Sequence, residues 1–206
     1  MADGIDIILQ RIHEKLDRLR TLDAGFRVFG SGSHRYRMGH ALTDGDLKFL
    51  EGQLGAPLPP DYRQFLMKIG HGGAGPGYGL FALDSEDPEN ITSLPYLSRP
   101  FEWTDAFNPV KWEEPSQHEG VGSDEDGAFV GMTLPGALYL CHCGCALRVF
   151  IVVNGKSKGE VWHDWQADGA GVYPATDSQG RRVPFVDWYE EWLDRSLLEI
   201  GAAAHS

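Results

Sequence analysis

The sequence predicts a single α+β domain in which a twisted antiparallel β-sheet is flanked by helices, with an additional helix at the N-terminus. Three observations support this fold class. Apolar residues recur at helical spacing in the first third of the chain and again near its C-terminal end. Between residues 129 and 164, four short runs are rich in β-forming residues. Asn154-Gly155 separates two of these runs, and so short a connection implies antiparallel neighbours.

The first element is an amphipathic helix over residues 3–20. Its apolar residues lie three or four positions apart and form one stripe: Ile5, Ile8, Leu9, Ile12, Leu16 and Leu19. We assign residues 1–24 to this added helix, whose packing the sequence does not place. The next residues, 25–40, are basic and rich in glycine and serine, and we expect an extended connection there. Ser31, Ser33 and His34 lack a nearby acidic residue to orient the histidine, so we do not predict catalysis.

Two more helices are predicted over residues 43–54 and 60–69, as a hairpin packed on the sheet. Thr43 and Asp46 match a capping pattern, and Pro59-Pro60 suit a helix entry because proline has no N–H to leave unpaired. The buried faces are expected to carry Leu47, Leu50 and Leu54 on the first helix and Tyr62, Phe65, Leu66 and Ile69 on the second.

A dense run of glycines follows the second of these helices: Gly70, Gly72, Gly73, Gly75, Gly77 and Gly79. A phosphate-binding loop would need a Lys-Ser/Thr pair and a helix after the last glycine. Here the glycines follow a helix and lead into a strand-like stretch at Tyr78–Phe81. We therefore predict a structural turn and not a nucleotide site.

Strands are predicted over residues 129–132, 137–142, 146–153 and 160–164, followed by a C-terminal helix that begins near residue 185. In the last strand, alternation places Trp162 in the core and His163 at the surface. Glu190 and Glu191 are expected on the solvated face of the helix, and residues 199–206 as a flexible tail. The helix's buried side is predicted to carry Phe185, Trp188, Tyr189 and Trp192.

Composition restricts the possible functions. The 206 residues carry a net charge of −12, which disfavours direct nucleic-acid binding and suits a basic protein partner. No apolar stretch is long enough for a transmembrane helix, and the N-terminus lacks the apolar core of a signal peptide. We therefore expect a cytoplasmic protein.

All three cysteines lie in one short run, Cys141, Cys143 and Cys145. Residues two apart in a strand share a face, so the three thiols could converge. Zinc sites usually combine two separated ligand pairs, and here only His163, expected on a neighbouring strand, could add a ligand. We predict no metal and no cofactor, and keep metal binding at this cluster as an alternative.

Three blocks in order resemble the SUKH superfamily, named for the fungal Smi/Knr cell-wall assembly regulators and including many bacterial immunity proteins. The first block runs from Leu58 to Phe81, the second from Gly136 to Trp162 and the third from Phe185 to Leu193. The resemblance covers residues 42–193, within a main domain that we place at residues 25–198. Its matching residues are Leu58, Pro59, Tyr62, Phe65, Leu66, Gly72, Gly73, Gly79, Leu80 and Phe81, then Gly136–Leu140, Gly144, Cys145, Phe150–Val153, Gly155 and Gly159–Trp162.

The resemblance implies a non-enzymatic protein-binding domain, and most specifically an immunity protein that neutralises a toxin by covering its active surface. Three alternatives stay open: a housekeeping regulatory module of the cell-wall or signalling type, a metal-binding protein, and an enzyme whose site is built from residues set aside above. A toxin-like gene next to the coding sequence would favour the immunity role over the regulatory module.

We predict a partner-binding surface made of two segments that combine carboxylates with aromatic side chains, as rims and centres of interfaces do. The alternative is that these aromatic residues only cover the core, with the interface on the basic stretch 27–37. The predicted partner-binding residues are Asp84, Glu86, Asp87, Glu89, Trp103, Phe107, Trp112, Asp124, Glu125 and Asp126.

Overall fold

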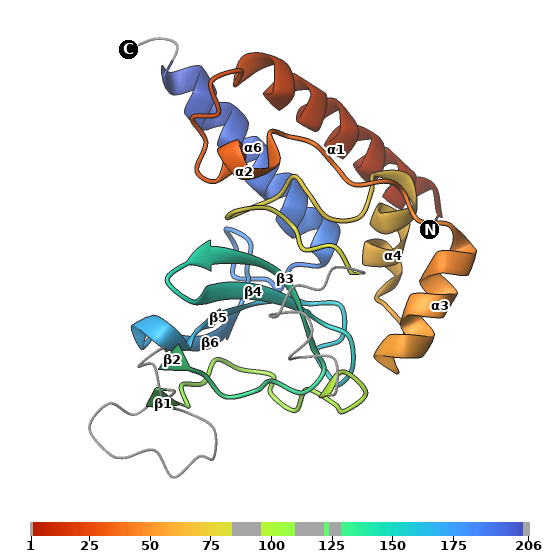
Figure 1. Ribbon diagram of the computed structural model, residues 1–206, viewed down its shortest axis with the longest axis vertical. Coiled ribbons are helices and arrows are strands. Elements are labelled where there is room, and N and C mark those ends of the chain that lie inside the picture. The colour runs from red at the N-terminus through yellow and green to blue at the C-terminus, as the bar shows by residue number, and fades with distance from the viewer. Residues whose placement is uncertain (1, 84–95, 110–121, 124–128, 204–206) are drawn as a thin grey trace.

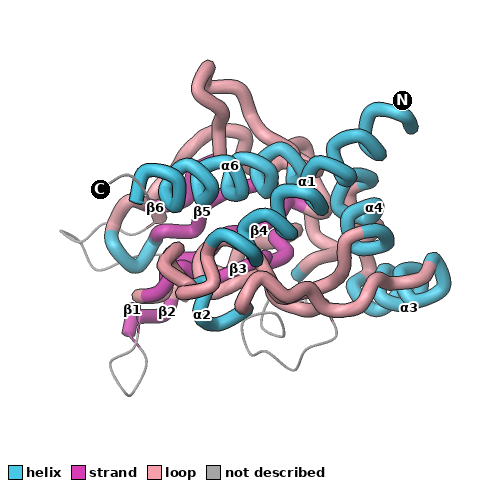
Figure 2. The backbone as a smooth tube through the Cα atoms, turned by 90° about the horizontal axis from the view of Figure 1, so that it is seen from above, coloured by secondary structure: helices cyan, strands magenta, loops and turns pink. Residues whose placement is uncertain are grey.

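The computed structural model describes residues 2–83, 96–109, 122–123 and 129–203 (Figure 1). Its main helices lie on one side of a four-stranded antiparallel sheet, which confirms the predicted α+β class. The long helices α1 (Ala2–Leu22) and α6 (Phe185–Ala203) run side by side (Figure 2). Next to them lie α3 (Asp44–Leu54) and α4 (Pro60–Lys68), the predicted hairpin.

The sheet has the strand order β3-β4-β5-β6, with every neighbouring pair antiparallel. These strands span Ala137–Gly144, Leu147–Val152, Val161–Trp165 and Gly171–Pro174. The last one was not predicted, because a four-residue stretch that begins with glycine and ends with proline carries little strand signal. A short 3-10 turn, η2 (Gln166–Asp168), brings it back alongside β5. A separate ribbon pairs β1 (Gly122–Ser123) with β2 (Phe129–Val130).

Both faces of the sheet are buried, each in its own apolar cluster. Toward the helices, Leu140, Ile151 and Val161 pack in one core with residues of α1, α4 and α6. On the opposite face, Phe150 and Trp162 pack with Phe101 and Leu134, which come from outside the sheet. The described helices therefore cover one face only, and residues 96–109 help to cover the other.

The added N-terminal helix is part of the main core. Leu9, Ile12, Leu16 and Leu19 of α1 are almost fully buried in the cluster that contains α6. Glu190, which we expected in solvent, is buried where α1 meets α6, because Arg11 and Lys15 of α1 both pair with it. The expectation of a solvated Glu190 was wrong, since charge alone does not show which helix will lie opposite.

Local backbone signals account for most helix ends. Thr43 caps α3 in a capping box with Asp46, and Pro60 is the first residue of α4, as predicted. A one-turn helix, α2 (Ser31–His34), replaces part of the predicted extended connection, because left-handed residues at Gly30 and Arg35 reverse the chain on either side. α6 continues to Ala203, into the predicted tail.

The glycine-rich run is a structural element, as predicted. Gly73 and Gly79 have φ values of 99° and 107°, and a Cβ at either position would overlap a backbone carbonyl oxygen. The residues that follow do not form a regular strand. Instead, the N–H groups of Tyr78 and Phe81 donate to the carbonyls of His142 and Leu140, at 3.1 and 2.7 Å. The run therefore holds a short segment along the outer edge of β3.

Candidate protein-interaction surface

Trp103 and Phe107, two predicted partner-binding residues, lie together in the segment that covers the sheet. Their rings stack with centroids 4.4 Å apart and planes 13° apart. Beneath them is the buried Phe101, 5.3 Å from Trp103 and 4.9 Å from Trp162 of β5. Both rings are half-buried. The pair therefore covers the second core and at the same time keeps part of its surface open to solvent.

This segment is held in place from behind. The N–H of Phe107 donates to the carbonyl of Val172 at 2.9 Å, and the N–H of Val172 returns a bond of 2.7 Å. Arg182 donates from Nη2 to the carbonyl of Thr104 at 2.6 Å, and Ser157 donates from Oγ to the carbonyl of Trp103 at 3.1 Å. These bonds from the sheet edge and two loops fix the backbone on which the two rings sit.

The outward side of the segment is acidic. Glu102 and Asp105 belong to the same short segment as the aromatic pair and are exposed, with 89% of the Asp105 side chain open to solvent. Arg182 lies 3.7 Å from Asp105, at the edge of the surface. The described residues thus form an acidic aromatic surface made of Glu102, Trp103, Asp105 and Phe107. Sequence analysis had named its aromatic members but neither of these two carboxylates.

The remaining predicted partner-binding residues lie outside the described part of the chain and stay a prediction. They are Asp84, Glu86, Asp87, Glu89, Trp112, Asp124, Glu125 and Asp126.

The cysteines occupy the end of the β3–β4 hairpin with graded exposure. Cys141 is buried, Cys143 is half-buried and Cys145 is exposed at the tip. A hydrogen bond with the Cys141 thiol lowers the pKa of Cys143, against the effect of burial. His163 lies two strands away, because Val149 of β4 pairs with Cys141 on one side and His163 on the other. Two strand spacings amount to about 10 Å, too far for shared coordination. Among the described residues no group of three His, Cys, Asp or Glu side chains is placed to hold a metal ion.

His163 and Asp164 point to opposite faces of β5, as the strand pattern predicts. His163 is not exposed, which corrects our expectation: its ring stacks on Tyr173 at 5.0 Å, and burial lowers its pKa to about 4. Asp164 is buried on the other face, where it accepts hydrogen bonds from Tyr139 Oη and Gln166 Nε2 at 2.7 and 2.8 Å. Asp164 therefore satisfies a core hydroxyl and does not orient the histidine.

Ser31 and His34 of α2 also serve the fold. Ser31 donates from Oγ to the carbonyl of Val28 at 2.6 Å. His34 accepts from the N–H of Tyr36 at Nδ1, at 3.0 Å, and its ring contacts Trp192 of α6 edge-on. Burial lowers the pKa of His34 to about 4, so the imidazole is neutral at physiological pH.

Sequence analysis missed an acidic cleft of about 670 Å³ between α6 and the turn around residues 177–183. Its acidic wall consists of Asp187, Glu190, Glu191 and Asp194, which follow a spacing of three and four that places them on one helix face. The opposite wall carries an ion pair between Asp177 and Arg181. The spacing of the acidic residues on the helix could have been recognised in the sequence. The opposite wall could not, because only the fold brings residues 177–183 next to α6.

The geometry defines an α+β domain that presents the acidic aromatic surface on one face of its sheet. Comparison with family models matches residues 41–195 to the SMI1 / KNR4 family (SUKH-1), and the chain belongs to this family. The match confirms the resemblance read from the three sequence blocks, and domains of this family are generally protein-interacting. Comparisons with curated proteins and with solved structures give no significant match. None of the described helices has the length and apolar character needed to cross a bilayer.

Proposed function

We propose that this chain is a non-enzymatic, cytoplasmic protein-binding domain that acts as an immunity protein, neutralising a toxin by covering its active surface. Family membership supports the protein-binding role. The observation that carries the proposal is the stacked pair Trp103–Phe107, which shares one short segment with the exposed carboxylates Glu102 and Asp105. Aromatic side chains in a rigid setting are the usual centres of protein interfaces, and charged groups form the rim.

The charge of the chain favours a basic partner. A net charge of −12 attracts a basic protein from a distance and raises its association rate at low salt. A toxin that acts on nucleic acid needs a basic cleft to hold phosphates, so an acidic aromatic surface would complement it. Occlusion requires no chemistry from the immunity protein, only that it cover the cleft tightly.

The binding mode is expected to use side chains and not strand addition. The Tyr78–Phe81 segment already occupies the outer edge of β3, and Phe107 pairs with the outer edge of β6. A partner strand would have to displace one of them. The sheet therefore acts as a support for loops, which is the arrangement that many binding surfaces use.

The direct test is co-expression in a bacterial host with each toxin-like protein encoded beside this gene. Protection of the host, together with a purified complex in which the toxin is inactive, is the expected result. A stable complex that leaves the toxin active would favour a regulatory module. Absence of any complex with all adjacent gene products would contradict the immunity role.

Two pairs of variants locate the interface. Trp103→Ala should speed dissociation of the complex by about tenfold or more, whereas Phe49→Ala, at an exposed ring on α3, should not. Glu102→Lys with Asp105→Lys should slow association at low salt, and this difference should shrink as salt is raised. The matched control is Glu14→Lys with Glu199→Lys, which changes the same charge on the outer faces of α1 and α6. If both double variants slow association equally, the effect comes from net charge alone and does not place the interface at Glu102 and Asp105.

A further inference from the structure

A second exposed aromatic surface lies far from Trp103. Phe29, Tyr78 and Phe26 expose 60%, 40% and 37% of their surfaces, although large apolar side chains are normally covered. Arg35 and Arg37, both exposed, come from the same part of the chain. We infer that this basic aromatic patch, made of Phe26, Phe29, Arg35, Arg37 and Tyr78, binds an acidic segment of a protein.

The rings of the patch are held by segments distant in sequence. Phe29 meets Tyr78 edge-on at 5.3 Å, and Tyr78 stacks on His142 of β3 at 4.7 Å. The backbones beneath are in direct contact, because a Cβ on Gly30 would overlap the carbonyl of Gly77, and a Cβ on Gly77 would overlap that of His142. Such close packing fixes the rings before a partner arrives, which lowers the entropy cost of binding.

Backbone strain is concentrated in the same segment. Phe26, Arg35 and Tyr36 have φ values of 52°, 50° and 54°, in the left-handed region that side chains other than glycine, asparagine and aspartate rarely adopt. The buried Tyr36 is secured by a hydrogen bond from Oη to Asp23, at 2.7 Å. Phe26 and Arg35 are exposed, and the Arg35 guanidinium lies 5.9 Å from the centre of the Phe26 ring. Strain retained at exposed positions is typical of functional surfaces.

The charge of this segment is opposite to that of the whole chain. Residues 24–40 contain three arginines and no carboxylate, in a protein with a net charge of −12. The acidic residue that directly precedes this segment in the sequence, Asp23, is buried and accepts hydrogen bonds from the N–H groups of Arg27 and Val28. Within the described residues neither Arg35 nor Arg37 forms an ion pair. Exposed arginine and aromatic groups without carboxylates match the composition of interface centres and complement an acidic partner.

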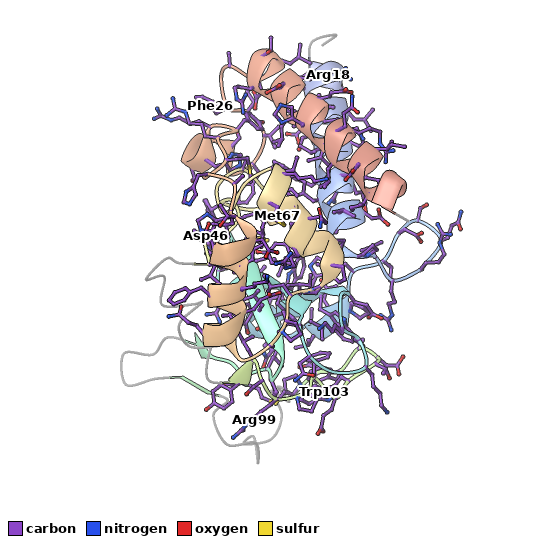
Figure 3. All side chains as sticks on the ribbon, turned by 90° about the vertical axis from the view of Figure 1, so that its right-hand side faces the viewer. Arg18, Phe26, Asp46, Met67, Arg99 and Trp103 are labelled. Carbon is purple, nitrogen blue, oxygen red and sulfur yellow. The ribbon has the colours of Figure 1, made fainter. Side chains whose placement is uncertain are left out.

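Most of the patch precedes the family-matched region, and all of it is distant from the surface proposed above. Residues 26–37 precede the matched region 41–195, and they contribute four of the five patch residues. Figure 3 shows Phe26 and Trp103 toward opposite ends of the molecule. The patch therefore adds an interaction to the domain whether or not the acidic aromatic surface binds a toxin. We favour an acidic peptide over nucleic acid. A nucleic acid carries many closely spaced negative charges and extends beyond the patch, where the acidic remainder of the protein would repel it.

The test is selection of random dodecapeptides displayed on phage, using the intact protein, followed by fluorescence anisotropy with the selected synthetic peptides. Two variants alter the patch: Phe29→Ser, and Arg35→Glu with Arg37→Glu. Their controls are Phe49→Ser, at another exposed ring, and Arg99→Glu with Lys156→Glu, which makes the same change in net charge at exposed positions elsewhere. Circular dichroism melts verify that each variant is folded.

We expect the selected peptides to be enriched in Asp and Glu over the starting library. Both patch variants should weaken their binding by about tenfold or more, and both controls should leave it nearly unchanged. Peptides that are neutral or basic, no enrichment, or equal binding by patch and control variants would overturn the inference. Binding of a single-stranded oligonucleotide that is lost with Arg35→Glu and Arg37→Glu would assign the surface to nucleic acid instead. Because these variants leave Trp103 and its neighbours intact, the outcome does not depend on the toxin.

Discussion

Arg11 of α1 pairs with Glu190 of α6 through two parallel hydrogen bonds, Nε to Oε1 at 2.7 Å and Nη2 to Oε2 at 2.6 Å. Lys15, one helical turn further on, donates to the same carboxylate at 2.8 Å. Glu190 thus joins the N-terminal helix, which precedes the family match, to the closing helix of the matched region. The bidentate geometry sets the rotation of the two helices as well as their contact.

Replacing Glu190 with Gln should lower the free energy of unfolding by about 1–3 kcal/mol, because Arg11 and the mostly buried Lys15 lose their shared partner. Hydrogen bonding from Arg11 lowers the pKa of Glu190. Its stabilising contribution is therefore present above the unfolded-state pKa and lost as the pH falls through the lowered folded-state value. Urea titrations at neutral and acidic pH measure both effects. Glu191→Gln, at an exposed residue 3.8 Å from Arg195, is the control and should change little.

Burial of His34 predicts a second pH dependence. Its pKa is lowered to about 4 from 6.5 by burial, so the unfolded chain binds a proton more readily than the folded one in this range. The contribution of neutral His34 to the free energy of unfolding should be fully present above pH 6.5. Acidification to pH 5 should lower the free energy of unfolding by roughly 2 kcal/mol. His34→Asn keeps an acceptor for the N–H of Tyr36 but does not titrate, and should reduce the slope of stability against pH. The same substitution at His13, exposed on α1, should leave the slope as it is. An unchanged slope for His34→Asn would contradict the assignment.

The tip of the β3–β4 hairpin should accept a stabilising substitution. Cys145 and Ala146 form a two-residue turn with φ values of 50° and 59°, the conformation in which Asn-Gly is preferred. Replacing the pair with Asn-Gly should raise the free energy of unfolding by about 1–2 kcal/mol. Thermal melts test this, and Cys145→Ser controls for loss of the thiol. Destabilisation by Asn-Gly would mean that the native side chains make contacts that outweigh the strain.

The cysteine cluster is predicted to hold no structural metal. Elemental analysis of protein purified without added metal should show well under one zinc per chain, because the spacing of Cys141, Cys143 and Cys145 brings no second ligand pair and His163 lies across an intervening strand. A chelator should leave the melting temperature unchanged. Near-stoichiometric zinc, lost together with the fold on chelation, would contradict this prediction.

Local rules predicted the elements well and their relationships less well. The capping pattern at Thr43 and the prolines before α4 were readable because they act within a few residues. Glu190 and His163 were misplaced because their surroundings come from α1 and β6, distant in sequence. The basic aromatic patch was missed for the same reason. Phe29 and Tyr78 are distant in sequence, and only the folded chain brings their rings together and stacks Tyr78 on His142.

Glycine substitution separates the scaffold role of the glycine-rich run from ligand binding. At Gly79, a Cβ would overlap the carbonyl oxygen of Gly73 while φ stands at 107°, so Gly79→Ala should lower the free energy of unfolding by about 2–4 kcal/mol. Gly52, inside α3, has open space around it, and Gly52→Ala should be neutral or stabilise by up to about 1 kcal/mol.

Thermal melts of the wild type with added nucleotides complete this last test. Because the glycine N–H groups of Gly73 and Gly79 are directed to the backbone, at Leu80 and Pro76, they are not presented to a phosphate. Nucleotides should therefore leave the melting temperature of the wild type unchanged. A nucleotide-dependent rise that Gly79→Ala abolishes and Gly52→Ala preserves would show that the run binds a ligand, since a scaffold alone gives no such difference.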